Sequence, residues 1–291
     1  MIYCPSCSAK LLVGAKFCHH CGTCLHDEGD LVLEPQKPKV TSRDLIYLYT
    51  PKDKKKLKAE VKADFFMALR KRVEDEQKAS LYADYVERFY KVRFQDVLED
   101  RADILVDEMH QLQAKSKDAE SDFTLLVSQV FENLMDYLMI VHCSDLNLYP
   151  YPQAILKYAD EAQKLDKQIL ISDYLNLDVE VEKIYTDFIT MPTQKLRNAA
   201  DSFVQAGTDE RLYFIIDQTL LGSCKEGVAM TDKALYWKLH FERPHRILYT
   251  DIHTVRREKE WILINNKYFN VNVGLNIKMM KLLRKMKEVK F

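Results

Sequence analysis

Apolar residues recur every three or four positions over most of the chain between residues 51 and 203, which is the spacing of amphipathic helices. The pattern predicts long helices over 51–77, 79–115 and 121–141. Their apolar stripes are wider than a coiled-coil seam, so we expect them to pack on one another as an antiparallel bundle. An intermolecular coiled coil is the alternative.

Shorter helical patterns follow a turn marked by Pro150 and Pro152. They cover about 155–165, 181–188 and 196–203, and Gly207 stops the last of them. From residue 211 the spacing changes.

The C-terminal part consists of short β-branched and aromatic runs, separated by turn signals such as Gly222 and Pro244. These runs predict about seven strands, over 211–217, 227–231, 234–240, 245–250, 252–257, 260–264 and 267–273. Strands this short with tight links predict an antiparallel sandwich or barrel. A last amphipathic helix over 275–289 has cations on most faces other than its apolar one. This helix is able to close the open end of the barrel.

One stretch within these strands resembles a known family. Residues 225–238 read K-E-G-V-A-M-T-D-K-A-L-Y-W-K and contain the pattern G-x-x-x-T-D-K-x-x-Y. Together with seven strands followed by a helix, this resembles bacterial pleckstrin-homology-like (PH-like) domains of the GRAM/YokE type over about residues 195–291. The resemblance implies a fold, and it implies that Thr231, Asp232 and Lys233 shape a hairpin turn rather than bind a ligand.

The N-terminus carries the clearest chemical signal, two C-x-x-C pairs. We expect one structural Zn²⁺ held by their four thiolates, from Cys4, Cys7, Cys18 and Cys21. Four sulfur ligands leave the metal no open position, so this site would not be catalytic. Cys24, one x-x step beyond Cys21, is the rival ligand. Disulfides are the other alternative, which a reducing compartment disfavours.

Residues 2–25 resemble the short zinc ribbons of many bacterial proteins, which bind nucleic acid or protein or cap a domain. Such a segment is too short to bury a core, so metal binding would supply its folding free energy. The sequence thus predicts a multi-domain α+β protein, whose expected parts are a zinc ribbon (1–26), a Pro-containing linker (27–50), a helical domain (51–192) and a PH-like β-sandwich or barrel capped by a helix (193–291).

Composition narrows the class of protein. The 291 residues are 47% hydrophobic and 30% charged with a net charge of −1, so no global field attracts nucleic acid or anionic lipid. Nucleotide-binding glycine motifs, H-E-x-x-H and G-x-S-x-G are absent, so we expect no enzymatic activity. No signal peptide precedes the ribbon, and the most apolar window, 134–142, is too short to span a bilayer. We therefore expect a cytoplasmic protein without a transmembrane segment.

Five cations of the strand region could face an anion or a lipid headgroup: Lys238, Arg243, Arg246, Arg256 and Arg257. Acidic neighbours such as Glu242 and Glu258 dilute this charge, so the sequence favours a protein partner and leaves a membrane surface and a homo-oligomer open. We expect a non-enzymatic cytosolic bacterial adaptor that acts through protein–protein contacts.

The alternative function is nucleic-acid binding through the ribbon and the lysines of the first predicted helix. Those lysines are Lys52, Lys54, Lys55, Lys56 and Lys58. The ribbon itself contributes only Lys10 and Lys16. Because phosphate neutralisation needs several clustered cations, the sequence disfavours nucleic acid as a partner.

Overall fold

A computed structural model describes residue 49 and residues 53–159 and 165–289. These residues mix helices with antiparallel sheets, which confirms the expected α+β class. They form two compact units, here called the helical unit (49 and 53–159) and the sheet unit (165–289). The division falls near residue 163 instead of the expected 193, so about thirty residues expected in the helical domain belong with the sheets.

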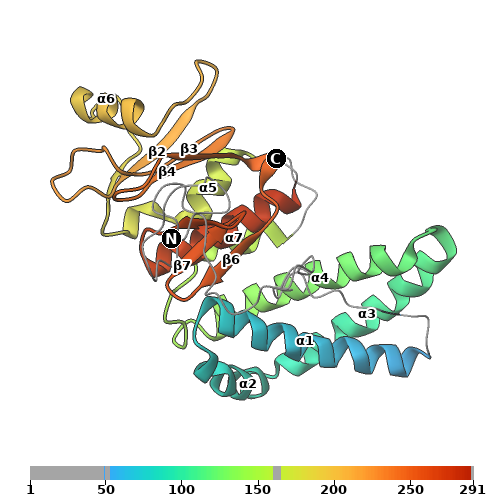
Figure 1. Cartoon of the computed structure of the whole chain (residues 1–291). Coiled ribbons are helices and arrows are strands. Elements are labelled where there is room, and N and C mark those ends of the chain that lie inside the picture. Colours follow the sequence, from blue (N-terminus) through green and yellow to red (C-terminus); the bar gives the residue numbers. More distant parts are fainter. Residues whose placement is uncertain (1–48, 50–52, 160–164, 290–291) are drawn as a thin grey trace, which may run out of the picture. The chain divides into compact units, whose positions relative to one another are not determined.

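The helical unit contains four α-helices, of which α1, α3 and α4 run side by side (Figure 1). Their bounds are Lys54–Glu76 (α1), Tyr82–Lys91 (α2), Phe94–Lys115 (α3) and Ala119–Tyr137 (α4). A π-turn over Leu138–His142 extends α4, and 3₁₀ turns cover Ala79–Leu81 and Gln153–Ala159. Its core is aromatic. The rings of Phe65 and Phe131 are both fully buried and pack edge-to-face, with their centroids 5.4 Å apart.

The predicted helix over 79–115 is interrupted between α2 and α3, although no glycine or proline lies there. Arg93 breaks it by taking a left-handed conformation with φ of 57°. The change of direction brings the rings of Phe89 and Phe94 to 5.5 Å. Packing of these rings in the core offsets the cost of the strained residue.

By length and composition, Ala119–His142 is the one helical segment of the described residues that could cross a membrane. Within the helical unit its residues Phe123, Val127 and Phe131 are fully buried against the neighbouring helices. A core helix of a bundle has the same length and composition, so we describe it as one. The absence of a transmembrane segment stays a prediction.

The sheet unit contains two antiparallel meanders. The first, in the order β1-β2-β3-β4-β5, joins Lys183–Tyr185, Leu212–Asp217, Gly227–Thr231, Ala234–Lys238 and His245–Leu248. The second, β6-β7-β8, joins Val255–Glu258, Trp261–Ile264 and Lys267–Phe269. Strands β2 to β8 match the seven predicted strands within a few residues at each end. The unit also has three α-helices, α5 (Lys167–Leu175), α6 (Thr193–Ser202) and α7 (Val273–Glu288).

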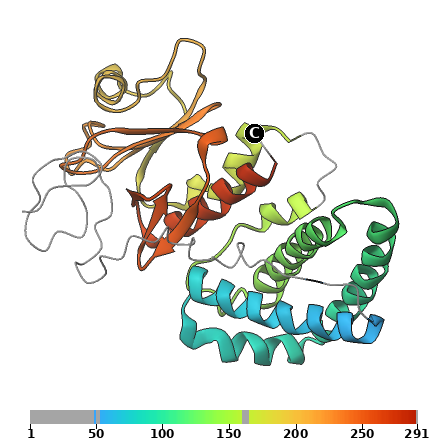
Figure 2. The ribbon, with the colours of Figure 1, turned by 45° about the vertical axis from the view of Figure 1, so that its right-hand side comes forward.

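One predicted helix is wrong. Residues 181–188 contain the edge strand β1, in which Ile184 pairs with Ile216 of β2. The apolar positions there fit both helical and strand spacing, and this segment forms a strand because it pairs with the open edge of β2. Sequence reasoning also missed α5, which packs against α7 (Figure 2).

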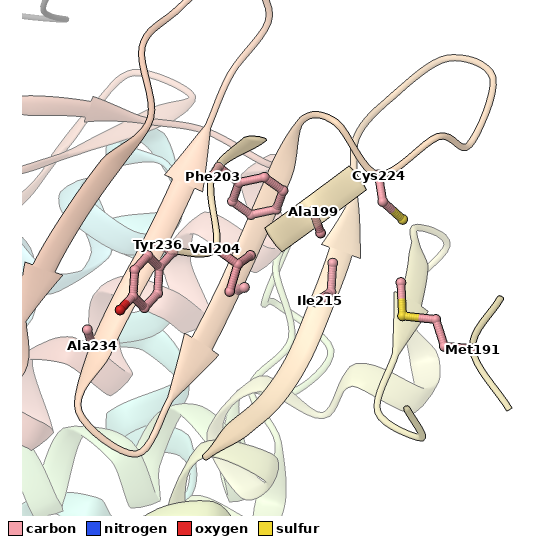
Figure 3. Packing of buried hydrophobic residues seen from close by; sticks show 9 residues of the cluster. Met191, Ala199, Phe203, Val204, Ile215, Cys224, Ala234 and Tyr236 are labelled. Carbon is pink, nitrogen blue, oxygen red and sulfur yellow. The ribbon is translucent and has the colours of Figure 1, made fainter. Parts of the chain in front are cut away.

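Both faces of the first sheet are covered. On one face Ile215, Ala229 and Tyr236 lie in one row across β2, β3 and β4. They pack with Ala199 and Phe203, of α6 and the residue that follows it (Figure 3). On the opposite face Trp237 donates from Nε1 to the carbonyl of Tyr268 in β8 at 2.9 Å, which ties the two sheets together.

Helix α7 is buried from Leu275 to Met286, its cations in this range included. The helix contacts β6, β7 and α5. Arg284 donates from Nε and Nη2 to the carbonyl of Val255 at 3.1 and 2.9 Å, and Lys278 pairs with Glu180 at 2.6 Å. These contacts compensate the burial of the charges.

Candidate interaction surface

The expected zinc ligands, Cys4, Cys7, Cys18 and Cys21, and their rival Cys24 lie outside the described residues. So do Lys52 and the expected linker, except for its residue 49. The zinc site therefore stays a prediction.

Arg246, the central expected cation, belongs to a packed polar network rather than to an open basic patch. Its Nε donates to the hydroxyl of Tyr236 at 2.8 Å and its Nη2 to Glu210 at 2.9 Å. Burial raises the pKa of Glu210, but donors including Thr231 and Tyr236 outweigh it and lower the pKa overall.

The other four expected cations are dispersed. Lys238 ends β4, where its Nζ donates to Ser202 Oγ at 2.8 Å. Arg243 is exposed in the loop between β4 and β5. Arg256 and Arg257 are neighbours on β6 in the other sheet, and their side chains therefore point to opposite faces. The structure does not gather the five cations into one site.

The lysines of the alternative nucleic-acid site face acidic residues of α3. Lys54 pairs with Asp107 at 2.8 Å. Lys58 pairs with Glu99 and with Asp103, both at 2.6 Å. Part of the positive charge that a phosphate backbone would need is thus neutralised within the bundle.

The residues of the G-x-x-x-T-D-K-x-x-Y pattern lie where the family resemblance implied, around the β3–β4 hairpin. Thr231 Oγ1 accepts hydrogen bonds from the backbone N–H groups of Lys233 and Ala234, at 3.1 and 3.0 Å. Asp232 Oδ1 accepts from the N–H of Arg211 at 2.8 Å. These side chains build the turn.

The titratable groups at the centre of the helical unit form a packed ion network. Arg72, with 1% of its side chain exposed, contacts Glu76 at 2.5 Å, Glu132 at 2.7 Å, and Asp136. Tyr151 donates to Glu76 at 2.9 Å. The three carboxylates together hold the pKa of Arg72 well above its ordinary value, although burial opposes them. These ion pairs join α1 to α4 inside the helical unit.

The buried cysteines are poor candidates for nucleophiles. Burial raises the pKa of Cys143 and of Cys224 to about 12, so both thiols are neutral at physiological pH.

Two loops at one end of the first sheet carry three strongly exposed apolar side chains. In the β2–β3 loop, Leu220 is 99% exposed and Leu221 is 91% exposed, and in the β4–β5 loop Phe241 is 86% exposed. We call these three residues the apolar tips. Ordinary turns hold polar residues or glycine at such positions, so exposed apolar side chains here indicate an interaction surface.

The β2–β3 loop is held in shape by its own hydrogen bonds. Asp217 Oδ1 accepts from the N–H groups of Thr219 and Cys224, at 3.0 and 3.2 Å. Gly222, with φ of 68°, donates to the carbonyl of Thr219 at 3.1 Å and closes a turn in which the two leucines are the central residues. The leucines are thus presented by a defined turn.

Both loops leave the first sheet at the same end of its strands, and below we call this end the edge that carries the apolar tips. Gly227 pairs with Asp217 on one side and with Lys238 on the other, so the end of β2, the start of β3 and the end of β4 lie in one row. In Figure 3, Cys224 of the β2–β3 loop lies at this end of the sheet, and Ala234, the first residue of β4, lies at the opposite end. His240 Nδ1 lies 3.0 Å from the carboxylate of Glu226, which joins the two loops.

Sequence reasoning missed this surface because it searched for cations. The available signal was a leucine pair beside a glycine inside a predicted turn. Comparison with protein-family models, with curated proteins and with solved structures yields no match for this chain.

Proposed function

We propose that this protein is a non-enzymatic cytosolic adaptor that acts by binding other macromolecules, mainly proteins. In this proposal the sheet unit is a PH-like domain, the N-terminal cysteines hold a structural Zn²⁺ ribbon, and the helical unit is a scaffold. The observation that carries the proposal is the layout of the sheet unit: strands β2–β5, to which β1 adds an edge strand, and strands β6–β8 form two antiparallel meanders, followed by α7. Seven strands and a closing helix are the layout of PH-like domains.

The G-x-x-x-T-D-K-x-x-Y residues support the proposal because each has a structural role in this layout. Gly227 begins β3, and Thr231 accepts hydrogen bonds within the hairpin turn. Asp232 bonds to the N–H of Arg211 before β2, and Lys233 pairs with Asp209. Tyr236 donates to Glu210 at 2.8 Å. A pattern that builds a fold without forming a reactive cluster fits a binding module.

The helical unit offers surface for a protein partner. Val97 and Ile104 of α3, and Leu125 and Tyr137 of α4, are between 41% and 59% exposed on helices whose other faces form the core. Aromatic and aliphatic side chains on rigid helices are what protein interfaces use as anchors. Ion pairs from Lys54 and Lys58 to α3 speak against nucleic acid at the same unit.

The test is a quantitative pull-down with the intact chain, with a chain that lacks residues 1–40, and with a Leu125→Asp and Ile104→Asp double variant. We expect a protein retained by the intact chain at near-stoichiometric level and lost in one of the two altered forms. Single- and double-stranded oligonucleotides at about 150 mM salt provide the opposing measurement. Micromolar binding that weakens when Lys54, Lys55 and Lys56 are substituted would overturn the proposal in favour of nucleic acid.

A further inference from the structure

We infer that the edge of the first sheet that carries the apolar tips docks onto an anionic lipid bilayer, with Leu220, Leu221 and Phe241 entering the headgroup–acyl boundary. This inference adds a membrane surface to the protein partner of the proposed function and does not depend on that partner.

The shape of the apolar tips favours a lipid bilayer over a protein as the partner. The tips are convex, since the three side chains are 99%, 91% and 86% exposed, and they belong to two separate loops. A protein partner would have to provide two cavities at matched spacing. A bilayer interface accepts any set of apolar side chains that reaches it from one side.

The β2–β3 tip has the composition that an interface requires. Residues 219–223 read T-L-L-G-S and contain no charge. The hydrogen bonds of Asp217 and Gly222 hold the turn before any partner binds, so little conformational entropy is lost on insertion.

Ammonium groups lie behind the leucines. A Cβ on Gly222 would lie 3.0 Å from Lys183 Nζ and 3.5 Å from Lys195 Nζ, so both cations flank the base of the turn. Lys225 is exposed at the end of the same loop. Cations at this position can reach lipid phosphates when the leucines are inserted.

The acidic groups near this edge do not form an outward negative patch. Asp217 is buried, its Oδ1 is used by the loop, and its Oδ2 would lie 3.6 Å from the same added Cβ, beside the two ammonium groups. Glu226 contacts His240, and Glu242 beside Phe241 is half-buried. Lys195 Nζ also donates to the hydroxyl of Tyr185 at 2.8 Å, which keeps this ammonium at the edge. The arrangement therefore combines apolar tips with flanking positive charge.

The experiment is flotation of the full chain with vesicles of phosphatidylcholine alone and of phosphatidylcholine with about one third phosphatidylglycerol. We expect binding to the anionic vesicles that weakens with salt. The double variant Leu220→Ser and Leu221→Ser should lose about tenfold in affinity, because two apolar side chains no longer enter the interface. Leu148→Ser in the helical unit, which removes an exposed leucine that belongs to neither proposed surface, is the matched control and should bind as the unaltered chain does.

Two further variants test depth and charge. In Phe241→Trp, quenching of the added tryptophan by brominated lipids, after subtraction of the signal of the unaltered chain, reports insertion. Lys183→Gln with Lys225→Gln should weaken binding at low salt only.

Failure of the unaltered chain to float with anionic vesicles would overturn the inference, as would equal binding by the Leu220 and Leu221 double variant. Because the substituted side chains are exposed, thermal melting should show all variants folded. Vesicle binding without any protein partner would support this inference and contradict the proposed function, so the two can fail separately.

Discussion

Gly227 lies directly against the backbone of Ile216: a Cβ at residue 227 would come within 1.9 Å of the Ile216 carbonyl oxygen. Its φ of 149° is also one that other residues avoid. The glycine that begins the G-x-x-x-T-D-K-x-x-Y pattern is therefore required by the close approach of β2 and β3.

We predict that Gly227→Ala lowers the free energy of unfolding by about 3 kcal/mol or more, since the strand pair must separate to admit a methyl group. Urea unfolding followed by tryptophan fluorescence measures this, because Trp237 and Trp261 both lie in the sheet unit. The control is Gly274→Ala in α7, where the nearest atom would be Asn272 Oδ1 at 3.4 Å. A smaller loss for residue 227 than for residue 274 would contradict the close-approach explanation.

The buried ion network predicts a large effect of Arg72→Met. The substitution leaves Glu76, Glu132 and Asp136 without their shared cation, so we expect a loss of about 3–5 kcal/mol. Urea unfolding followed by far-ultraviolet circular dichroism reports on the helices. Arg70→Met, which removes an exposed pair with Glu74 at 3.6 Å, should cost less than about 1 kcal/mol. Equal effects of the two substitutions would mean that the network does not stabilise the bundle.

Two groups near β4 and β5 make opposite contributions to the pH dependence of stability. Burial raises the pKa of Glu242 to about 7 and, with help from Lys267, lowers the pKa of His245 to about 4. Folded Glu242 holds its proton more tightly than unfolded Glu242, so its contribution to stability is lost as pH rises from about 4.5 to 7. Folded His245 resists protonation, so its contribution is lost as pH falls from about 6.5 to 4.

We predict that Glu242→Gln removes the pH dependence of stability due to Glu242 and leaves that due to His245. The variant should be more stable than the unaltered protein at pH 8, by about 1 kcal/mol after solvent screening of this half-buried group. Its advantage should shrink as pH falls below about 7 and vanish below about 4.5, where the carboxyl is protonated in the unfolded chain as well. Thermal melting at a series of pH values measures this, with the exposed Glu258→Gln as control. A pH-independent difference would show that Glu242 does not titrate in this range.

The cysteine spacing predicts one Zn²⁺ per chain, measured by elemental analysis of protein purified without chelator. Cys18→Ser should reduce the metal content by more than half, because three thiolates bind zinc less tightly than four. Cys224→Ser, which changes a buried thiol of the sheet unit, should leave it unchanged. Full occupancy after Cys18→Ser would assign Cys24 as the fourth ligand.

Local patterns in the sequence were sufficient for most elements. The helical spacing around Phe65 and Phe123 and the turn signals at Gly222 and Asn265 located α1, α4 and strands β2 to β8, because each depends on residues close together in the chain.

Only the tertiary structure decided which residues far apart in the sequence meet. It made a strand of 183–185 by offering it the edge of β2, and it buried the cations of α7 beside partners such as Glu180 and Val255. It also placed Leu220 and Phe241 on one edge of a sheet. Strand register and helix packing depend on non-local contacts, and no spacing within a single segment encodes these.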